Sequence, residues 1–241
     1  MPTAIGIGIG ICFGSGGVAA PIPEPPETLG ANLILRCRSD VGTAASWTDQ
    51  VGGAHFVQGT GANQPTINAT GGPNGTPSFL FDGVDNYMVS PINLPAPGTT
   101  PTYLWLIFRQ VTWTSGRRLL NSGTANRMHF LQTGATPQIN SGNGVNYSNT
   151  NATVNTYRRA EVLWNNAASD YFKIGSVETT GAGMGNTDPA ANLTLGADNA
   201  AANFGNLEIC EILIANAAPS AGQRTQLDTY ASARYGAGVL A

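Results

Sequence analysis

The sequence predicts an all-β protein, a β-sandwich with one C-terminal helix and an extended N-terminal arm. Short apolar runs recur at intervals of roughly ten residues, separated by Gly, Asn, Asp and Pro clusters, a spacing typical of sandwiches. The 241-residue chain is 41% hydrophobic but only 10% charged, against about 25% charged in average proteins. Asn, Thr, Ser and Gly replace the missing charges. We expect an arm over residues 1–28 and one β domain over residues 29–241, since all-β folds of this length often form a single unit.

The predicted arm alternates Ile with Gly, which places four isoleucine side chains on one face of a strand and leaves the other face bare. Such a strand suits close approach to another backbone, and an extended peptide can add to a partner's sheet edge. We therefore predict an assembly arm, with a frayed terminus as the alternative. Its apolar residues are Ile5, Ile7, Ile9 and Ile11. The proline-rich residues 21–27, PIPEPPE, predict a stiff spacer after it.

The apolar runs of the body predict its strands in order. Residues 103–111, YLWLIFRQV, are nearly all apolar and predict a core strand. Residues 77–83, PSFLFDG, predict a strand that runs into an Asp-Gly turn. The remaining predicted strands are Leu33–Leu35, Ser46–Gln50, Arg118–Asn121, Met128–Gln132, Arg158–Asn165, Tyr171–Ser176, Leu193–Gly196 and Leu207–Ala215.

A helix is predicted near the C-terminus, where Ser220 and Gln223 form a capping box. An apolar face with helical spacing follows, and Gly236 marks the end of the helix. This face is expected to dock on a sheet. Its residues are Leu227, Tyr230, Ala231 and Arg234.

Charge and hydropathy exclude some partners. The formal net charge of −3 offers nothing to attract phosphates, so we expect no nucleic-acid partner. No apolar stretch approaches 18 residues, so we expect no transmembrane helix and no membrane partner. The apolar run near the N-terminus has no Lys or Arg before it and is interrupted by Gly, unlike a signal peptide.

Several segments together resemble concanavalin A-like lectin/glucanase domains of the laminin-G type. The resemblance covers roughly residues 33–236, and it implies an antiparallel jelly roll, in agreement with the strand spacing. The arm before such a domain resembles bacteriophage virion proteins such as tail appendages and head decorations. The segments are W-x-D-Q at Trp47–Gln50, G-A-N-Q-P-T at Gly61–Thr66, F-D-G-x-D-N-Y at Phe81–Tyr87, L-T-L-G at Leu193–Gly196, Gly205–Ile214, and the helix ending in Arg234-Tyr235-Gly236.

The acidic residues argue against catalysis. The glucanase branch of that superfamily carries E-x-D-x-E, whose spacing aims three carboxylates into one cleft. Here Glu208 and Glu211 are three residues apart on one predicted strand, so we expect them on opposite faces. We expect Glu211 to be a structural hydrogen-bonding residue and Glu208 to lie on the surface. The sequence therefore predicts no catalytic residues and no enzyme.

Acidic and amide residues cluster at two predicted turns. Loop oxygens of this kind often bind Ca²⁺ in laminin-G and lectin domains, and calcium needs six to eight of them. The alternative, which we favour, is that they form turns by bonding their own backbone. Calcium is the one cofactor we consider, because His55 and His129 stand alone in the sequence. The candidate ligands are Asp82, Asp85, Asn86 and Asp198.

The longest polar segment, residues 138–155, predicts a recognition loop. Trp105 and Trp164 lie in apolar runs and are expected in the core, whereas Trp113 lies among polar residues and is a candidate for stacking on a sugar. The predicted glycan-binding residues are Trp113, Asn143, Asn146 and Tyr147.

Three cysteines, Cys12, Cys37 and Cys210, make an odd number, so at least one is free or pairs with another chain. One hypothesis is a Cys37–Cys210 disulfide between the first strand and a late strand. The alternative is three small buried thiols.

Three functions follow from these observations. The first is a non-enzymatic bacteriophage virion component, a head decoration or tail appendage, that contacts other virion proteins and copies of itself and adheres to host-surface glycans through its loops. The second is a secreted or surface bacterial carbohydrate-binding lectin-like domain. The third is a glycan-cleaving enzyme with an atypical site. The first places the protein in the virion.

Overall fold

The computed structural model describes residues 24–96, 99–122, 128–134, 136–143, 145–165, 169–181, 183 and 190–241. The four arm isoleucines and Cys12 lie outside the described residues, so the assembly arm stays a prediction. Among the described residues, no helix is both long enough and apolar enough to cross a membrane.

The described elements are sixteen strands and two α-helices, with short 3₁₀ turns at Gly30–Asn32, Gly61–Asn63, Pro73–Gly75 and Ala237–Leu240. The helices are α1 Pro25–Leu29 and α2 Ala221–Tyr235. The strands are β1 Leu33–Thr43, β2 Ser46–Asp49, β3 Phe56–Val57, β4 Thr66–Asn68, β5 Ser78–Asp82, β6 Met88–Leu94, β7 Thr102–Gln110, β8 Arg118–Ser122, β9 His129–Thr133, β10 Gln138–Asn143, β11 Val145–Asn149, β12 Arg158–Trp164, β13 Asp170–Ile174, β14 Val177–Gly181, β15 Ala190–Leu195 and β16 Asn206–Ala215.

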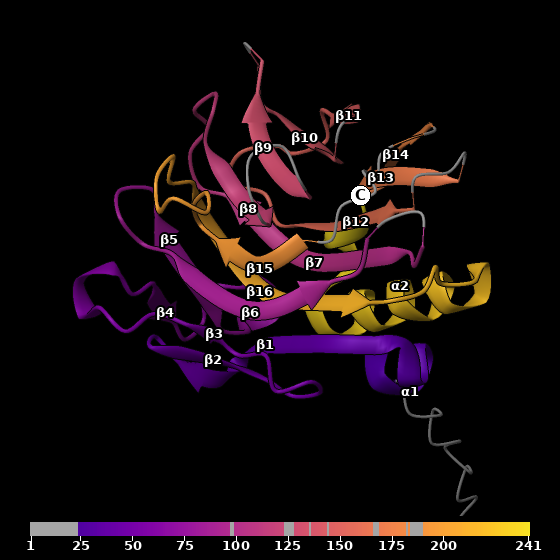
Figure 1. The fold of residues 1–241 in the computed structure, drawn as a ribbon, viewed down its shortest axis with the longest axis horizontal. Helices are drawn as coiled ribbons and strands as arrows, with labels where there is room; N and C mark the ends of the chain where they lie inside the picture. The colour runs from indigo at the N-terminus through magenta and orange to yellow at the C-terminus, as the bar shows by residue number, and fades with distance from the viewer. Residues whose placement is uncertain are drawn as a thin grey trace, which may run out of the picture.

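The paired strands form an antiparallel jelly-roll sandwich, as predicted, in the order β11-β10-β9-β8-β15-β6-β3-β2-β1-β16-β7-β12-β13-β14. β5 adds to β16 and carries β4. The two ends of this path approach each other, because the Asn149 side chain donates to the Val177 carbonyl at 2.9 Å and Thr179 donates to the Ser148 carbonyl at 3.3 Å. The sandwich is therefore nearly closed (Figure 1).

The core has two parts, on opposite sides of the sheet that contains β16. Inside the sandwich, Trp47 stacks on Phe79 with ring centroids 4.6 Å apart, and Phe130 packs on Phe172. On the other side of the sheet, buried residues of α2 pack against Trp105 of β7. Trp105 and Trp164 are fully buried, as predicted.

The predicted helix is confirmed as α2. Ser220 accepts a hydrogen bond from the Gln223 backbone, and the Gln223 side chain accepts one from the Ser220 backbone, which completes the capping box. Leu227, Tyr230 and Ala231 are buried as expected, but Arg234 is only half-buried. The buried residue near the end of the helix is Tyr235.

Two predicted segments differ from the structure. Residues 21–23 of the expected spacer lie outside the described residues. In the described part, helix α1 begins at Pro25, since proline is tolerated in the first turn of a helix. Leu29 of α1 packs in the cluster beneath α2. The recognition loop expected over residues 138–155 is largely the hairpin of β10 and β11, in which polar residues pair across the strands.

Candidate functional site

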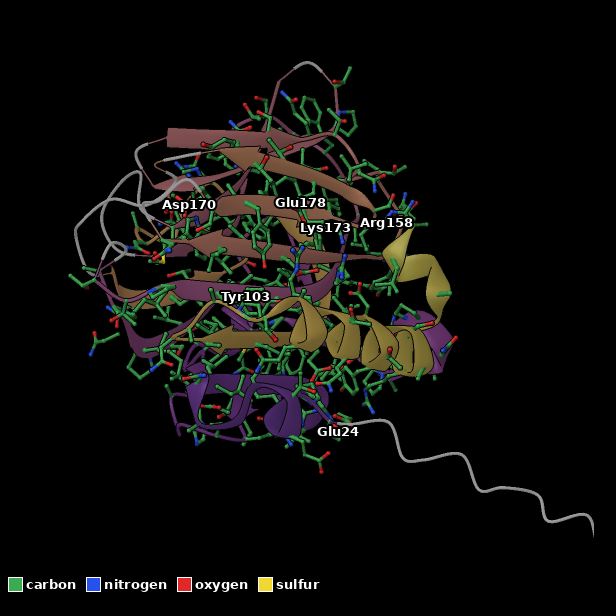
Figure 2. All side chains as sticks on the ribbon, turned by 90° about the vertical axis from the view of Figure 1, so that its right-hand side faces the viewer. Glu24, Tyr103, Arg158, Asp170, Lys173 and Glu178 are labelled. Atoms are coloured by element: carbon green, nitrogen blue, oxygen red, sulfur yellow. The ribbon has the colours of Figure 1, made fainter. Side chains whose placement is uncertain are left out.

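The sandwich has two outward faces. α2 packs over the outer side of β1, β16, β7, β12 and β13, which we call the covered face. In Figure 2, α2 crosses this sheet with Tyr103 beside it, and Lys173 and Glu178 lie on the strands beyond the helix. The outer side of β15, β8, β9, β10 and β11 we call the open face. Its polar side chains form the candidate site.

The first row of the open face follows from strand alternation. Leu195, Leu120 and Phe130 belong to the inner core, and successive side chains of a strand point to opposite sides. The preceding or following residue on each strand therefore points outward. These three residues lie opposite one another across β15, β8 and β9, and they are Thr194, Asn121 and His129.

A second row runs beside the first. Leu131 follows the inward Phe130 and points outward; it lies opposite Arg118 on β8 and Asn140 on β10. Asn140 in turn lies opposite Ser148 of β11, whose hydroxyl donates to the Asn140 side-chain oxygen. Residues directly opposite in an antiparallel pair share a face. The open face thus carries amide, hydroxyl, imidazole and guanidinium groups side by side.

The first row forms a buried floor and the second row is more accessible. Thr194, Asn121 and His129 are 2%, 4% and 2% exposed although they point away from the core, and the Thr194 hydroxyl donates to the Asn199 side-chain oxygen at 3.3 Å. Arg118 is half-buried. The accessible groups of the second row, Arg118, Asn140 and Ser148, can form hydrogen bonds with a polyhydroxylated ligand, and the first row supports them from below.

Of the predicted glycan-binding residues, the structure describes the side chains of Trp113 and Tyr147. Trp113 lies in the turn between β7 and β8, half-buried, with its indole nitrogen buried. Tyr147 packs against the inner core, with its hydroxyl against Gly181 of β14, so its ring does not lie on the open face. The side chains of Asn143 and Asn146 lie outside the described residues.

The candidate calcium ligands bond their own loops. The Asp82 carboxylate accepts from the backbone of Val84 at 2.8 Å and is within 3.3 Å of the Asp85 nitrogen and 3.4 Å of the Asn86 nitrogen. Asp198 likewise accepts from the backbone of its own turn. These contacts match the turn-forming alternative. Within the described part of the chain, no three His, Cys, Asp or Glu side chains gather as a metal site would require, and calcium binding stays a prediction.

The two glutamates of β16 do not lie on the opposite faces that their spacing predicts. The register with β7 shifts between Ile209 and Glu211, so a β-bulge adds one residue there. Because of this extra residue, Glu208 and Glu211 lie on the same side of the sheet, not on opposite sides. Glu208 was expected on the surface, but it is 1% exposed; it accepts from Arg109 at 2.7 Å and from the Tyr157 hydroxyl.

Glu211 is enclosed by donors beneath α2, as its predicted structural role requires. It accepts from Arg36 at 2.9 Å and from the hydroxyls of Tyr230 and Tyr235, each at 2.8 Å. Burial raises the pKa of Glu211, against the opposing effect of the Arg36 charge and of these hydrogen bonds. Arg36 also pairs with Glu24 at the start of α1.

Glu161 of β12 is the third buried carboxylate on the covered face. It pairs with Arg159 at 2.6 Å and Arg224 at 3.0 Å, and it accepts from the Tyr103 hydroxyl at 3.1 Å. Burial alone would raise the pKa of Glu161, but Arg159 and Arg224 hold it below its usual value. The carboxylates of this face are therefore bonded and buried, an arrangement that stabilises the fold and offers no access to substrate.

The predicted Cys37–Cys210 disulfide is wrong, because both residues are free and buried thiols. Cys37 belongs to the inner core and Cys210 to the cluster beneath α2, so the sheet separates them. The alternative of buried free thiols is what the structure has at these two positions.

No protein-family model matches the sequence, and no curated protein is detectably similar to it. Solved structures share the fold. The binding domain of botulinum neurotoxin serotype D superposes with a TM-score of 0.63 at 10% identity, covering 85% of this chain and 52% of that one. Trypanosoma rangeli sialidase in complex with sialic acid superposes with 0.59 at 10% identity, covering 90% and 35%. The binding domain of Paraclostridial Mosquitocidal Protein 1 gives 0.57 at 11% identity, covering 83% and 52%.

This chain thus spans about half the length of the toxin binding domains and about a third of the sialidase. At these identities the likeness shows the fold alone. The neighbours are mostly binding domains; the neurotoxin D ligand-binding domain was solved with N-acetylneuraminic acid, and the sialidase is an enzyme.

Sequence reasoning missed the open-face row. His129 was considered only as a metal ligand, and Thr194 and Asn121 lay in predicted strands without any assigned role. The available signal was the alternation of Asn121 and His129 with core residues on their strands. That Thr194 lies beside them depends on the pairing of β15 with β8, which brings distant segments together.

Proposed function

We propose that the protein is a non-enzymatic, concanavalin A-like glycan-binding module whose binding surface is the open face. The observation that carries this proposal is the pair of adjacent polar rows on that face, Thr194–Asn121–His129 and Arg118–Leu131–Asn140–Ser148. Sugars are recognised through many hydroxyl groups, and side-chain amides and hydroxyls match them as both donors and acceptors.

The known neighbours support a binding role. A shared jelly-roll sandwich occurs in the toxin binding domains, including one solved with N-acetylneuraminic acid. Fold alone does not define function, so the weight of the proposal rests on the open face, and the neighbours add that this architecture is used by proteins with sugar ligands.

The covered face supports the non-enzymatic part. Most glycosidases use two carboxyl groups on either side of a bound sugar. Glu161, Glu208 and Glu211 share one face, but each is at most 1% exposed and bonded to arginine or tyrosine. A glycan has no route to them in the folded protein.

We place this module in a bacteriophage particle, as a head decoration or a tail appendage attached through the arm. The alternating isoleucines 5–11 and the low charge of the chain support an assembly role. The alternative is a secreted or surface bacterial lectin. Intact mass of the native protein and its copy number in purified virions separate the two: the virion component keeps its first 23 residues and co-purifies with particles, whereas the lectin is absent from them.

Glycan binding is tested on a glycan array with three versions of the full chain. The wild type is expected to retain a subset of glycans. Asn140→Ala removes a half-buried amide of the second row and is expected to weaken that binding roughly two- to tenfold, the usual range for one neutral hydrogen bond. Gln226→Ala removes an exposed amide from α2 and is expected to bind as the wild type does. Retention of no glycan, or equal loss in both variants, contradicts the proposal.

A further inference from the structure

Three arginines of the covered face form ion pairs with carboxylates of the same protein. Arg36 pairs with Glu211, Arg109 with Glu208, and Arg224 with Glu161 and Glu178. A buried guanidinium without an anion is costly, and in each of these cases a carboxylate of the same protein removes that cost.

Arg118 on the open face differs from them. It begins β8, opposite the outward Leu131. Its Nη1 atom is buried and has no hydrogen-bond partner, and burial lowers the pKa of Arg118, only partly opposed by the charge of Asp198. The guanidinium has therefore lost water on this nitrogen without gaining an acceptor.

The nearby carboxylate of Asp198 is occupied by its own loop. It accepts from the backbone nitrogens of Ala200 at 3.0 Å and Ala202 at 2.9 Å, and from the Asn203 side chain at 2.7 Å. Its effect on Arg118 is through charge at a distance. Although Nη1 itself is buried, Arg118 as a whole is only half-buried, so an anion from outside can still approach its guanidinium.

The amide and imidazole of the first row lie on the neighbouring part of the same strands. Asn121 is on β8 with Arg118, and His129 is on β9 with Leu131. An arginine fork binds a carboxylate or sulfate through charge-assisted hydrogen bonds, while the more accessible Asn140 amide and Ser148 hydroxyl of the second row bind the rest of a sugar. One glycan unit with an acidic group next to several hydroxyls fits this combination.

We propose that the open face prefers glycans with a negatively charged group, a carboxylate or a sulfate, and that Arg118 is the residue that binds this group. The proposal rests on the glycan-binding function and adds the chemical class of the ligand. Arg118 is then the specificity-determining residue of the site.

The experiment compares glycans that share a core and differ in one acidic group: sialyllactose for carboxylate, sulfated lactose for sulfate, and lactose as the neutral reference, within an array of other matched acidic and neutral glycans. The full chain is tested as wild type, Arg118→Gln, Arg118→Lys and Arg117→Gln. Arg117→Gln is the matched control, since it removes the same charge from the adjacent residue.

The wild type is expected to bind acidic glycans more tightly than their neutral counterparts. Arg118→Gln is expected to lower the affinity for the acidic members roughly ten- to a hundredfold, the range of a charge-assisted hydrogen bond, and Arg118→Lys to restore part of it because lysine keeps the charge but not the fork. Arg117→Gln is expected to bind as the wild type does. Circular dichroism verifies that each variant is folded.

Equal binding of acidic and neutral glycans, or acidic binding that survives Arg118→Gln, overturns the inference and leaves the glycan-binding function standing. Retention of no glycan at all overturns the glycan-binding function and this inference with it. Loss that is equal in Arg118→Gln and Arg117→Gln also overturns the inference, because it shows an effect of net charge alone. Carboxylate and sulfate are distinguished by which of the two lactose derivatives binds.

Discussion

The covered face and the open face both bury polar side chains, but they use them in opposite ways. On the covered face, Glu211 is fully buried and accepts from one arginine and two tyrosines. On the open face, Thr194 and His129 are 2% exposed, and Arg118 has a buried nitrogen without an acceptor. The difference teaches that burial alone does not mark a functional site. What matters is whether the protein itself already supplies the partner for each charge.

The largest expected effect is on the covered face. Glu161→Gln removes the charge that pairs with Arg159 and Arg224, and the Arg159 side chain is only 1% exposed. Breaking a buried ion pair by removing one partner costs about 3–5 kcal/mol, so the free energy of unfolding in urea is expected to fall by that amount. Glu178→Gln is the control, because Glu178 pairs with Arg224 at the surface, where a pair contributes about 0–1 kcal/mol. Equal losses in the two variants contradict the comparison.

Acid is expected to weaken the same network. Arg159 and Arg224 overcome the effect of burial and hold the pKa of Glu161 below its ordinary value of 4.5. A carboxylate whose pKa is lowered in the folded state stabilises the fold above the unfolded-state pKa, and this contribution is lost as the pH falls through the folded-state value. The free energy of unfolding is therefore expected to decline below about pH 4.5. Urea titrations across that range measure this decline. If Glu161→Gln loses the same amount of stability with falling pH as the wild type does, the decline is not due to Glu161.

A smaller effect is expected at the open-face floor. Thr194→Val keeps the side-chain shape and removes the hydroxyl that bonds Asn199. Thr194 is only 2% exposed, so its hydroxyl supports the floor without contacting the ligand, and its loss acts indirectly. Glycan affinity, measured by calorimetry with a glycan that the array identifies, is expected to fall roughly two- to tenfold. The control is Thr102→Val, because Thr102 is fully buried on β7 with a hydroxyl that has no partner; glycan affinity is expected to stay at the wild-type value there. A larger loss of affinity in the control contradicts the role of Thr194.

The smallest effect concerns the cysteines. Burial raises the pKa of the Cys210 thiol to about 12 and raises that of Cys37, so alkylation of both residues in the native protein is expected to be very slow. After denaturation without reductant, mass spectrometry is expected to show both residues alkylated. Detection of a linked Cys37–Cys210 peptide that is not alkylated would instead support the disulfide.

Much of the fold is readable from local pattern. The apolar run of β7 and the capping box at Ser220 and Gln223 need no long-range information, and both are confirmed. Other features depend on how strands pair. The bulge beside Glu211 is visible only when β16 is paired with β7. It places Glu208 and Glu211 on the same side of the sheet, whereas their spacing predicts opposite sides.

The candidate site was harder to predict for the same reason. Thr194, Asn121 and His129 come from three separate segments, and only the registers of β15, β8 and β9 align them. The Asn-rich segment at residues 138–155 looked like a loop because its residues are typical of turns, yet cross-strand pairing makes most of it a hairpin. Composition identified a neutral polar surface but not which part of it faces a ligand.

The most direct measurement is photo-crosslinking with a glycan that the array shows to be retained, followed by peptide mapping. The account predicts that the labelled positions fall within residues 118–148, the segment that contains Arg118, Asn140 and Ser148, and around Thr194. Labelling confined to α2, Ala221–Tyr235, would place the ligand on the covered face and contradict the account.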